Sequence, residues 1–251
     1  MNGLNLLADT IKNETGSRRA HLDPAGVVRR AASVLLLLIP GPDGPELLFE
    51  VRASKLDWQP GDICFPGGKR EYTDRNFAAA ALRETSEELG IRHTDIRLCG
   101  TLDFFAAHNG FMVYPFVGIW SPQPEDAGKR CRSTDAYAST QVDKDLPAGT
   151  PGVIPDYRNW GYNKEEVAEL FTVPLRYLVE NPPREANVEV EVRHGGDFPY
   201  DWMPNLKRGW SRRKDYTVYF YKYGDHVIWG MTAQILHGFL ERFGKEILHF
   251  A

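Results

Sequence analysis

The apolar run AASVLLLLIP, residues 31–40, constrains the fold more than any other feature of this 251-residue chain. It has ten residues, whereas a helix that spans a bilayer needs about 20. A turn signal, GPDG, follows it, and then a second apolar segment, ELLFEVR, at 46–52. We therefore expect a buried strand that pairs with its neighbour through a tight turn.

Later segments alternate irregularly between strand and helix patterns. Two strands are expected on either side of a turn signal at 108–110, and a hairpin with a Gly-Asp turn over 215–230. A helix over 231–243 follows. Because strands and helices mix without an internal repeat, we predict one mixed α/β domain over 30–251 after an N-terminal extension, 1–29.

Two segments stand apart from this pattern. Residues 121–162 are rich in Pro, Gly, Asp and Ser without a clear period, which favours a long ordered insertion or lid. Residues 3–14 have the pattern of a short amphipathic helix docked on the body. Whether the insertion covers the site or joins a partner subunit in a homodimer stays open.

Composition excludes several classes of protein. With 42% hydrophobic and 25% charged residues, the chain has the make-up of an ordinary globular domain. A formal net charge of −4 disfavours binding to the phosphate backbone of nucleic acids. The three scattered cysteines form no CxxC pair, and the N-terminus lacks an apolar signal core. We expect a cytoplasmic protein without membrane or nucleic-acid partners.

One short helix carries an unusual concentration of charge. Asn76 can cap its start, and Gly90 can end it in the left-handed conformation. Glu84, Glu87 and Glu88 stand at i, i+3 and i+4, so the three carboxylates share a face. Like charges there repel one another and oppose the helix dipole. The face therefore indicates a hard divalent cation such as Mg²⁺, whose ligands are oxygens.

The loop Phe65-Pro66-Gly67-Gly68 directly precedes this region. Its glycines allow a ligand to approach the backbone closely. Loop and helix together can grip a metal-bound diphosphate, with Arg83 orienting one of the glutamates. Either pattern alone is more often a plain turn or a solvated face, whereas the combination is much rarer.

The combination resembles the Nudix box. That signature reads Gly, five residues, Glu, seven residues, Arg-Glu, an apolar residue, any residue, Glu-Glu, any residue, Gly and an apolar residue. The chain matches it from Arg83 to Ile91, with Thr85 at the first apolar position. Five residues after Gly68 stands Asp74 in place of Glu, and eight residues, not seven, separate it from Arg83. This form resembles the coenzyme A diphosphatase branch.

A pattern upstream of the box also resembles that branch. Arg52, Ala53 and Gly61 keep the branch's spacing to Phe-Pro-Gly-Gly. Glu50 replaces a Thr of the pattern, and Asp57 replaces its second Arg. The second change reverses a charge that, in the branch, would help to hold a 3′-phosphate.

The resemblance implies a fold and an activity. The fold is an α/β Nudix α/β/α sandwich with a mixed sheet, to which this chain adds the long insertion. The activity is metal-dependent hydrolysis of a nucleoside diphosphate linked to another moiety. For coenzyme A or an acyl-coenzyme A, the products would be 3′,5′-ADP and the 4′-phosphopantetheine part. The cation would be Mg²⁺ or Mn²⁺.

The resemblance also implies roles for particular residues. The metal ligands would be Glu84, Glu87, Glu88 and the carbonyl of Gly68. The catalytic residues would be Glu84, Glu87, Arg83 and Glu169. Apart from the resemblance, the candidates for substrate binding are Gly67 and Gly68, which allow close approach, and the cations Arg52 and Lys69, for each of which a plain surface charge is the alternative. Glu169 matches the usual position of a carboxylate outside the box, and Glu165 or Glu166 is the alternative.

Three functions remain open at this point. The first is a coenzyme A or acyl-coenzyme A diphosphatase. The second is a Nudix pyrophosphatase for ADP-ribose, NADH or another dinucleotide, which the reversed charge at Asp57 and the long insertion keep in view. The third is a nucleotide-binding module without turnover, against which the complete set of box glutamates argues.

Overall fold

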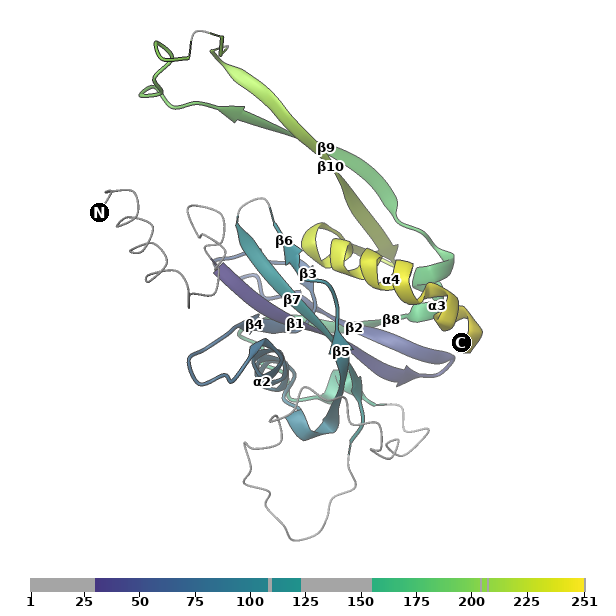
Figure 1. Cartoon of the computed structure of the whole chain (residues 1–251). Coiled ribbons are helices and arrows are strands. Elements are labelled where there is room, and N and C mark those ends of the chain that lie inside the picture. Colours follow the sequence, from purple (N-terminus) through teal and green to yellow (C-terminus); the bar gives the residue numbers. More distant parts are fainter. Residues whose placement is uncertain (1–29, 108–109, 123–154, 204, 207, 251) are drawn as a thin grey trace, which may run out of the picture.

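A mixed sheet forms the centre of the computed structural model, which describes residues 30–107, 110–122, 155–203, 205–206 and 208–250 (Figure 1). The expected N-terminal helix, most of the 121–162 insertion and the turn residues His108 and Asn109 lie outside these ranges. No helix in the described part of the chain has both the length and the apolarity needed to cross a membrane.

The central sheet, within the described residues, contains β1 (Arg30–Gly41), β2 (Gly44–Arg52), β3 (Ile63–Cys64), β4 (Gly67–Lys69), β5 (Ile96–Thr101), β6 (Phe105–Ala106), β7 (Phe111–Trp120) and β8 (Val167–Pro174). Its main order is β3-β2-β1-β7-β5, with β4 on β1, β6 on β7 and β8 on β2. Strands β1 and β7 run parallel and the other pairs antiparallel, so the sheet is mixed as expected. The tight turn between β1 and β2 is confirmed.

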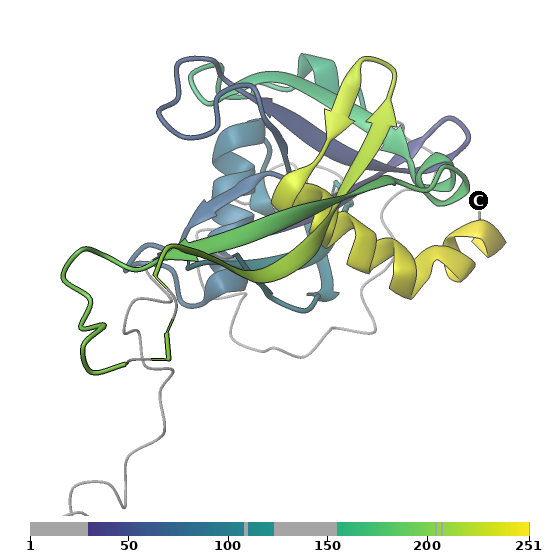
Figure 2. The same ribbon diagram turned by 90° about the horizontal axis from the view of Figure 1, so that it is seen from above.

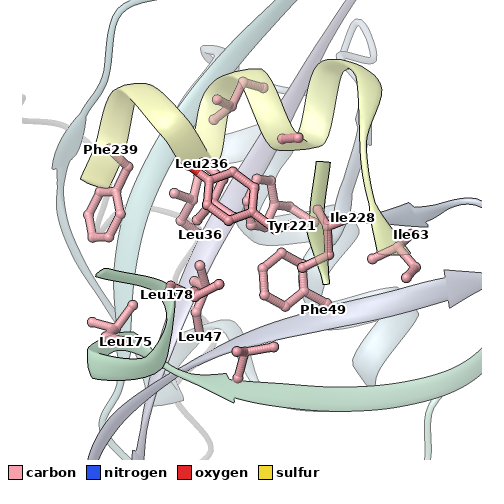
Figure 3. Packing of buried hydrophobic residues seen from close by; sticks show 14 of the residues in the cluster. Leu36, Leu47, Phe49, Ile63, Leu175, Leu178, Tyr221, Ile228, Leu236 and Phe239 are labelled. Carbon is pink, nitrogen blue, oxygen red and sulfur yellow. The ribbon is translucent and has the colours of Figure 1, made fainter. Parts of the chain in front are cut away.

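Helices cover both faces of this sheet. Helix α2 (Phe77–Leu89) lies on one face, and α3 (Leu175–Glu180) and α4 (Gly230–Phe250) lie on the other (Figure 1). Alternate residues of β1 serve the two sides: Leu35 and Leu37 pack in the cluster under α2, and Leu36 in the cluster under α3 and α4 (Figure 3). Burying each such leucine contributes about 1.5–3 kcal/mol. The α/β/α sandwich is therefore confirmed.

Helix α2 begins and ends where its sequence predicted. The side chain of Asn76 accepts a hydrogen bond from Ala79 N at 2.8 Å. Gly90 has a φ of 67°, and its N–H donates to the carbonyl of Ser86. These local caps place the three glutamates of the box on a helix of defined length.

A second, smaller sheet was only partly predicted. Strands β10 (Trp210–Tyr223) and β11 (His226–Ile228) form the expected hairpin. Strand β9 (Arg184–Arg193) pairs with β10 and was not predicted. The β9–β10 ribbon projects from the body (Figure 1) and crosses it in the view from above (Figure 2). Tyr221 and Ile228 anchor its base in the core beside α4 (Figure 3).

Two short 3-10 helices complete the described structure, η1 (His93–Asp95) after α2 and η2 (Tyr157–Asn159) before β8. Three aromatic residues at the end of the predicted insertion, Tyr157, Trp160 and Tyr162, pack against the cluster under α2. This end of the insertion is therefore part of the folded body.

Candidate functional site

Arg83 lies at the centre of a network of ion pairs. Its guanidinium donates to both oxygens of Asp74, at 3.0 Å each, and to one oxygen each of Glu84 and Glu87, at 2.9 Å. A further bond at 3.2 Å reaches the carbonyl of Lys69. These hydrogen bonds from Arg83 lower the pKa of Asp74. The acidic residue before the helix thus holds the arginine, and the arginine orients two glutamates.

Glu88 points into the protein toward the glycine strand. It is buried, and its Oε2 accepts a hydrogen bond from Gly67 N at 2.7 Å. Burial, together with repulsion from Glu50 and Glu84, raises its pKa well above the ordinary range. A Cβ on Gly68 would lie 2.5 Å from the carboxyl carbon of Glu84, so strand β4 and helix α2 are in close contact. Strand β4 and helix α2, which contain the two halves of the box, are therefore joined by the hydrogen bond from Gly67 N to the carboxylate of Glu88.

Glu50, on β2, is a buried carboxylate that the sequence did not single out as functional. It is 1% exposed. The thiol of Cys64 donates to its Oε1 at 3.1 Å, and its Oε2 has no hydrogen-bond partner among the described residues. Burial raises the pKa of Glu50 to about 7 and raises the pKa of the Cys64 thiol. The signal that pointed to this position was its departure from the Thr of the upstream pattern.

Glu169, expected as the carboxylate outside the box, lies away from the box glutamates. Its Oε1 is 3.4 Å from Nε2 of His226. It shares the sheet face of Phe171, which stacks on His226 and packs in the cluster under α4. Glu165, one of the two alternatives, forms an ion pair with Lys55.

The charge of Glu166, the other alternative, acts on the glutamates of the box. Its charge raises the pKa of Glu84 and of Glu88, in each case less than burial does. It acts in the same direction on Glu50. The charge of Glu166 therefore acts on the group of carboxylates, whereas Glu169 faces His226 and Glu165 pairs with Lys55. Glu169 is directed away by the alternation of faces along β8, since Phe171 packs in the cluster under α4 and Leu170 packs in the cluster under α2.

A cleft of about 1140 Å³ opens beside this group. Gly67, Gly68, Lys69 and Arg52 line one part of it, so all four predicted substrate-binding residues border the same space. Arg52 Nε donates to the carbonyl of Trp58 at 3.2 Å, which fixes its side chain. The side chain of Lys69 is exposed and forms no ion pair within the described part of the chain.

The opposite part of the cleft is built by segments from the end of the chain. Val188 comes from β9 and Phe220 from β10, whereas Trp229 and Met231 lie at the start of α4. The rings of Phe220 and Trp229 are parallel, with centroids 6.3 Å apart. The cleft thus has two cations and two glycines at one end, and apolar side chains of the central sheet, the ribbon and α4 along the rest.

The chemistry of this carboxylate group suits a divalent cation. Its donors are oxygens, which hard cations prefer. Burial and mutual repulsion disfavour the charged forms of Glu84, Glu88 and Glu50, and a cation would relieve both effects. In the described residues no three His, Cys, Asp or Glu side chains already converge on one point, since Arg83 draws Glu84 and Glu87 to itself. Cation binding would therefore have to compete with that arginine.

Comparison with known proteins agrees with these features. A family model described as NUDIX domain matches residues 28–185. An "Uncharacterized Nudix hydrolase NudL" from Photorhabdus laumondii is 30% identical over 208 residues, which cover 83% of this chain and 82% of that protein. The "Peroxisomal coenzyme A diphosphatase NUDT7" of Mus musculus is 36% identical over 187 residues, covering 74% of this chain and 62% of the mouse protein. Among solved structures, a MutT/nudix family protein from Enterococcus faecalis aligns over 95% of this chain and 70% of its own, with 13% identity and a TM-score of 0.44.

Proposed function

The chain belongs to the Nudix family of pyrophosphohydrolases, and from this premise we propose that its substrate is coenzyme A or an acyl-coenzyme A. Hydrolysis of the diphosphate releases 3′,5′-ADP and the 4′-phosphopantetheine part. The observation that carries the proposal is the set of carboxylates organised by Arg83 next to the glycine strand, whose residues Gly67 and Gly68 line the cleft. The name of the mouse relative and the Phe-Pro-Gly-Gly pattern support the choice of substrate.

The residues of the site have separate roles: some bind the substrate and others position the carboxylates. Lys69 and Arg52 offset the charge of the diphosphate, and Gly67 and Gly68 let it approach the backbone. Arg83 is a positioning residue, because it orients Glu84 and Glu87.

The cation, Mg²⁺ or Mn²⁺, would be held by Glu84, Glu87, Glu88 and the Gly68 carbonyl, and when bound it supplies charge neutralisation and makes a water more acidic. Glu166 is our candidate for the group that accepts the proton of the attacking water, because its charge acts on Glu84 and Glu88. A general base of this kind contributes about 10²–10⁴-fold to the rate.

A second substrate class is favoured by one observation. Asp57 is exposed on the loop where the branch pattern has a cation. Among the described residues, the cations that line the cleft are Arg52 and Lys69. Coenzyme A carries a 3′-phosphate in addition to the diphosphate, whereas ADP-ribose and NADH do not. A dinucleotide substrate without the third phosphate therefore remains the alternative. The binding module without turnover is set aside, because the relatives are named hydrolases.

A substrate panel separates the two classes. The purified chain is assayed with Mg²⁺ or Mn²⁺ on coenzyme A, an acyl-coenzyme A, ADP-ribose, NADH and diadenosine polyphosphates, and the products are resolved by chromatography. We expect 3′,5′-ADP from coenzyme A at the highest kcat/KM. A higher kcat/KM for ADP-ribose or NADH, with AMP as product, would transfer the proposal to the second class.

A cytoplasmic location and a small-molecule partner complete the proposal, supported by the three scattered cysteines and the net charge of −4. A homodimer remains a prediction that the oligomeric state in solution would test.

A further inference from the structure

The register of β2 directs Glu50 toward the box helix. Successive side chains of a strand point to opposite faces of the sheet. Leu48 packs in the cluster under α2, and Phe49 packs in the cluster under α3 and α4. Glu50 follows Leu48 by two residues and therefore points to the face that α2 covers. Glu88 lies on that helix, and the two carboxylates repel each other.

The carboxylate of Glu50 is unfavourable for folding by itself. It is 1% exposed, one oxygen is bonded only to a thiol, and the other oxygen has no partner in the described part of the chain. A buried charge without a partner destabilises a protein, and a buried polar atom that lacks a hydrogen bond is rare. A Thr, as in the upstream pattern of the branch, would avoid most of this penalty. Such a local conflict is typical of residues kept for function.

The charges around Glu50 indicate which kind of group would stabilise its carboxylate. Glu88 and Glu166 add negative charge, and Arg52 adds one positive charge. Arg52, however, directs its Nε to the carbonyl of Trp58. Arg83, the other nearby cation, is bonded to Asp74, Glu84 and Glu87, so no described cation is bonded to either Glu50 or Glu88.

We propose that Glu50 is an additional oxygen ligand of the divalent-cation site, acting together with Glu88. This chain then binds its cation with one carboxylate more than the box supplies. The inference rests on the proposed function only in placing the cation at the box helix. Loss of a supporting group around a metal typically weakens metal affinity by roughly 10–100-fold. We expect at least that effect for Glu50, because its oxygen would contact the cation directly.

Binding of Mn²⁺ to the full chain tests this without any substrate. The free Mn²⁺ signal is followed by electron paramagnetic resonance in the wild type and in the Glu50→Thr and Glu50→Gln variants. Glu46→Gln is the matched control, because Glu46 lies on the same strand and face and bonds to the hydroxyl of Thr172. We expect a Kd for Mn²⁺ raised roughly 10–100-fold in both Glu50 variants and unchanged in the control.

A thermal melt in EDTA separates a ligand from a structural residue. If Glu50 is a ligand, both variants melt at pH 8 at or above the temperature of the wild type, since at that pH they lose an unpartnered buried charge. An unchanged Kd for Mn²⁺ in both variants overturns the inference. So does a clear fall in melting temperature, or failure to fold, in both variants, because Glu50 would then be needed for the fold.

The proposed function fails on a different observation. If no substrate of the panel is hydrolysed but Mn²⁺ binding depends on Glu50, the function is wrong and the inference stands. If coenzyme A is hydrolysed but Mn²⁺ binds equally well without Glu50, the inference alone is wrong.

Discussion

Arg83 turns a row of mutually repelling glutamates into an ordered set. Exposed ion pairs contribute about 0–1 kcal/mol, because water screens them. The pair with Asp74 differs, since Asp74 is 6% exposed and receives two parallel hydrogen bonds from the guanidinium. Paired bonds of this kind are both stronger and more directional. The Asp that replaces the Glu of the family signature therefore serves the same network from a position one residue further from the arginine.

Replacement of Glu87 by Gln should remove activity and leave the fold intact. Glu87 is an exposed side chain that pairs with Arg83, so its loss is expected to change the free energy of unfolding by less than about 1 kcal/mol. Its proposed place in the cation site predicts a fall in kcat/KM of at least about 100-fold. Steady-state kinetics and urea unfolding check both values.

Glu180→Gln is the control for this change, because Glu180 forms the same i,i+4 pair with Arg176 on α3. It should lower neither activity nor stability by a measurable amount. An unfolded Glu87→Gln protein, with full turnover per folded molecule, would contradict the assignment of this helix face.

The pKa of Glu50 predicts a pH-dependent stability of the metal-free protein. Burial raises this pKa from 4.5 to about 7, so the folded state favours the neutral carboxyl. The stabilisation from proton binding is complete below pH 4.5 and is lost as the pH rises through 7. From pH 5 to pH 8, the free energy of unfolding of Glu50→Gln should therefore rise relative to that of the wild type, by on the order of 2 kcal/mol. Urea unfolding in EDTA at both pH values measures the difference, and parallel pH profiles would refute it.

At the scale of elements, the site depends on how closely β4 approaches β1. Gly67 pairs with Val34 and has a φ of 145°, a conformation that side chains rarely adopt. A Cβ at this position would lie 2.2 Å from the carbonyl oxygen of Ser33. The same residue donates its N–H to Glu88. The glycine is therefore required by the pairing of the strands and also connects β4 to α2.

Gly67→Ala should separate β4 from β1. We expect a loss of about 2–3 kcal/mol in the free energy of unfolding, from backbone strain and the clash, together with a large loss of activity. Gly100→Ala is the control, since a Cβ at Gly100 in β5 meets nothing within 4 Å. The control should change the stability by less than about 1 kcal/mol. Equal stabilities of the two variants in urea would show that the approach of β4 to β1 is not as close as described.

At the scale of the whole molecule, the cleft joins two separate parts of the chain. Its polar side belongs to the segment matched by the NUDIX domain model, residues 28–185. Its apolar lining comes partly from the same segment, with Phe105, Phe111 and Val113, and partly from β10 and the region where α4 begins, which follow that segment. The phosphates would lie at the first side and the rest of the substrate along the second. Differences in specificity are therefore expected to come from the C-terminal segment.

Trp229→Ala should raise KM severalfold and keep kcat, because Trp229 lines the apolar side and lies away from the carboxylates. Trp202→Ala is the control: its side chain is 82% exposed, in the loop that joins β9 to β10, and does not line the cleft. Steady-state kinetics with the best substrate of the panel distinguish the two. A lower kcat at unchanged KM for Trp229→Ala would mean that this residue acts on the reacting atoms.

The sequence by itself determined the features that local chemistry controls. A cap at Asn76, a left-handed glycine at Gly90 and carboxylates spaced three and four residues apart act within a few turns of one helix. The first two strands and their turn are equally local, and so they were predicted correctly.

Only the tertiary structure decided which distant residues meet. The register of β2 turns Glu50 toward α2, and the register of β8 turns Glu169 toward His226 and the cluster under α4. The ribbon pairs β9 with β10 across the loop 194–209, which is too long to show as a hairpin turn, and the second wall of the cleft depends on how this ribbon and α4 pack on the sheet. A one-residue change of register moves a side chain to the other face of a sheet, and which helix then covers that face is decided by packing between distant segments.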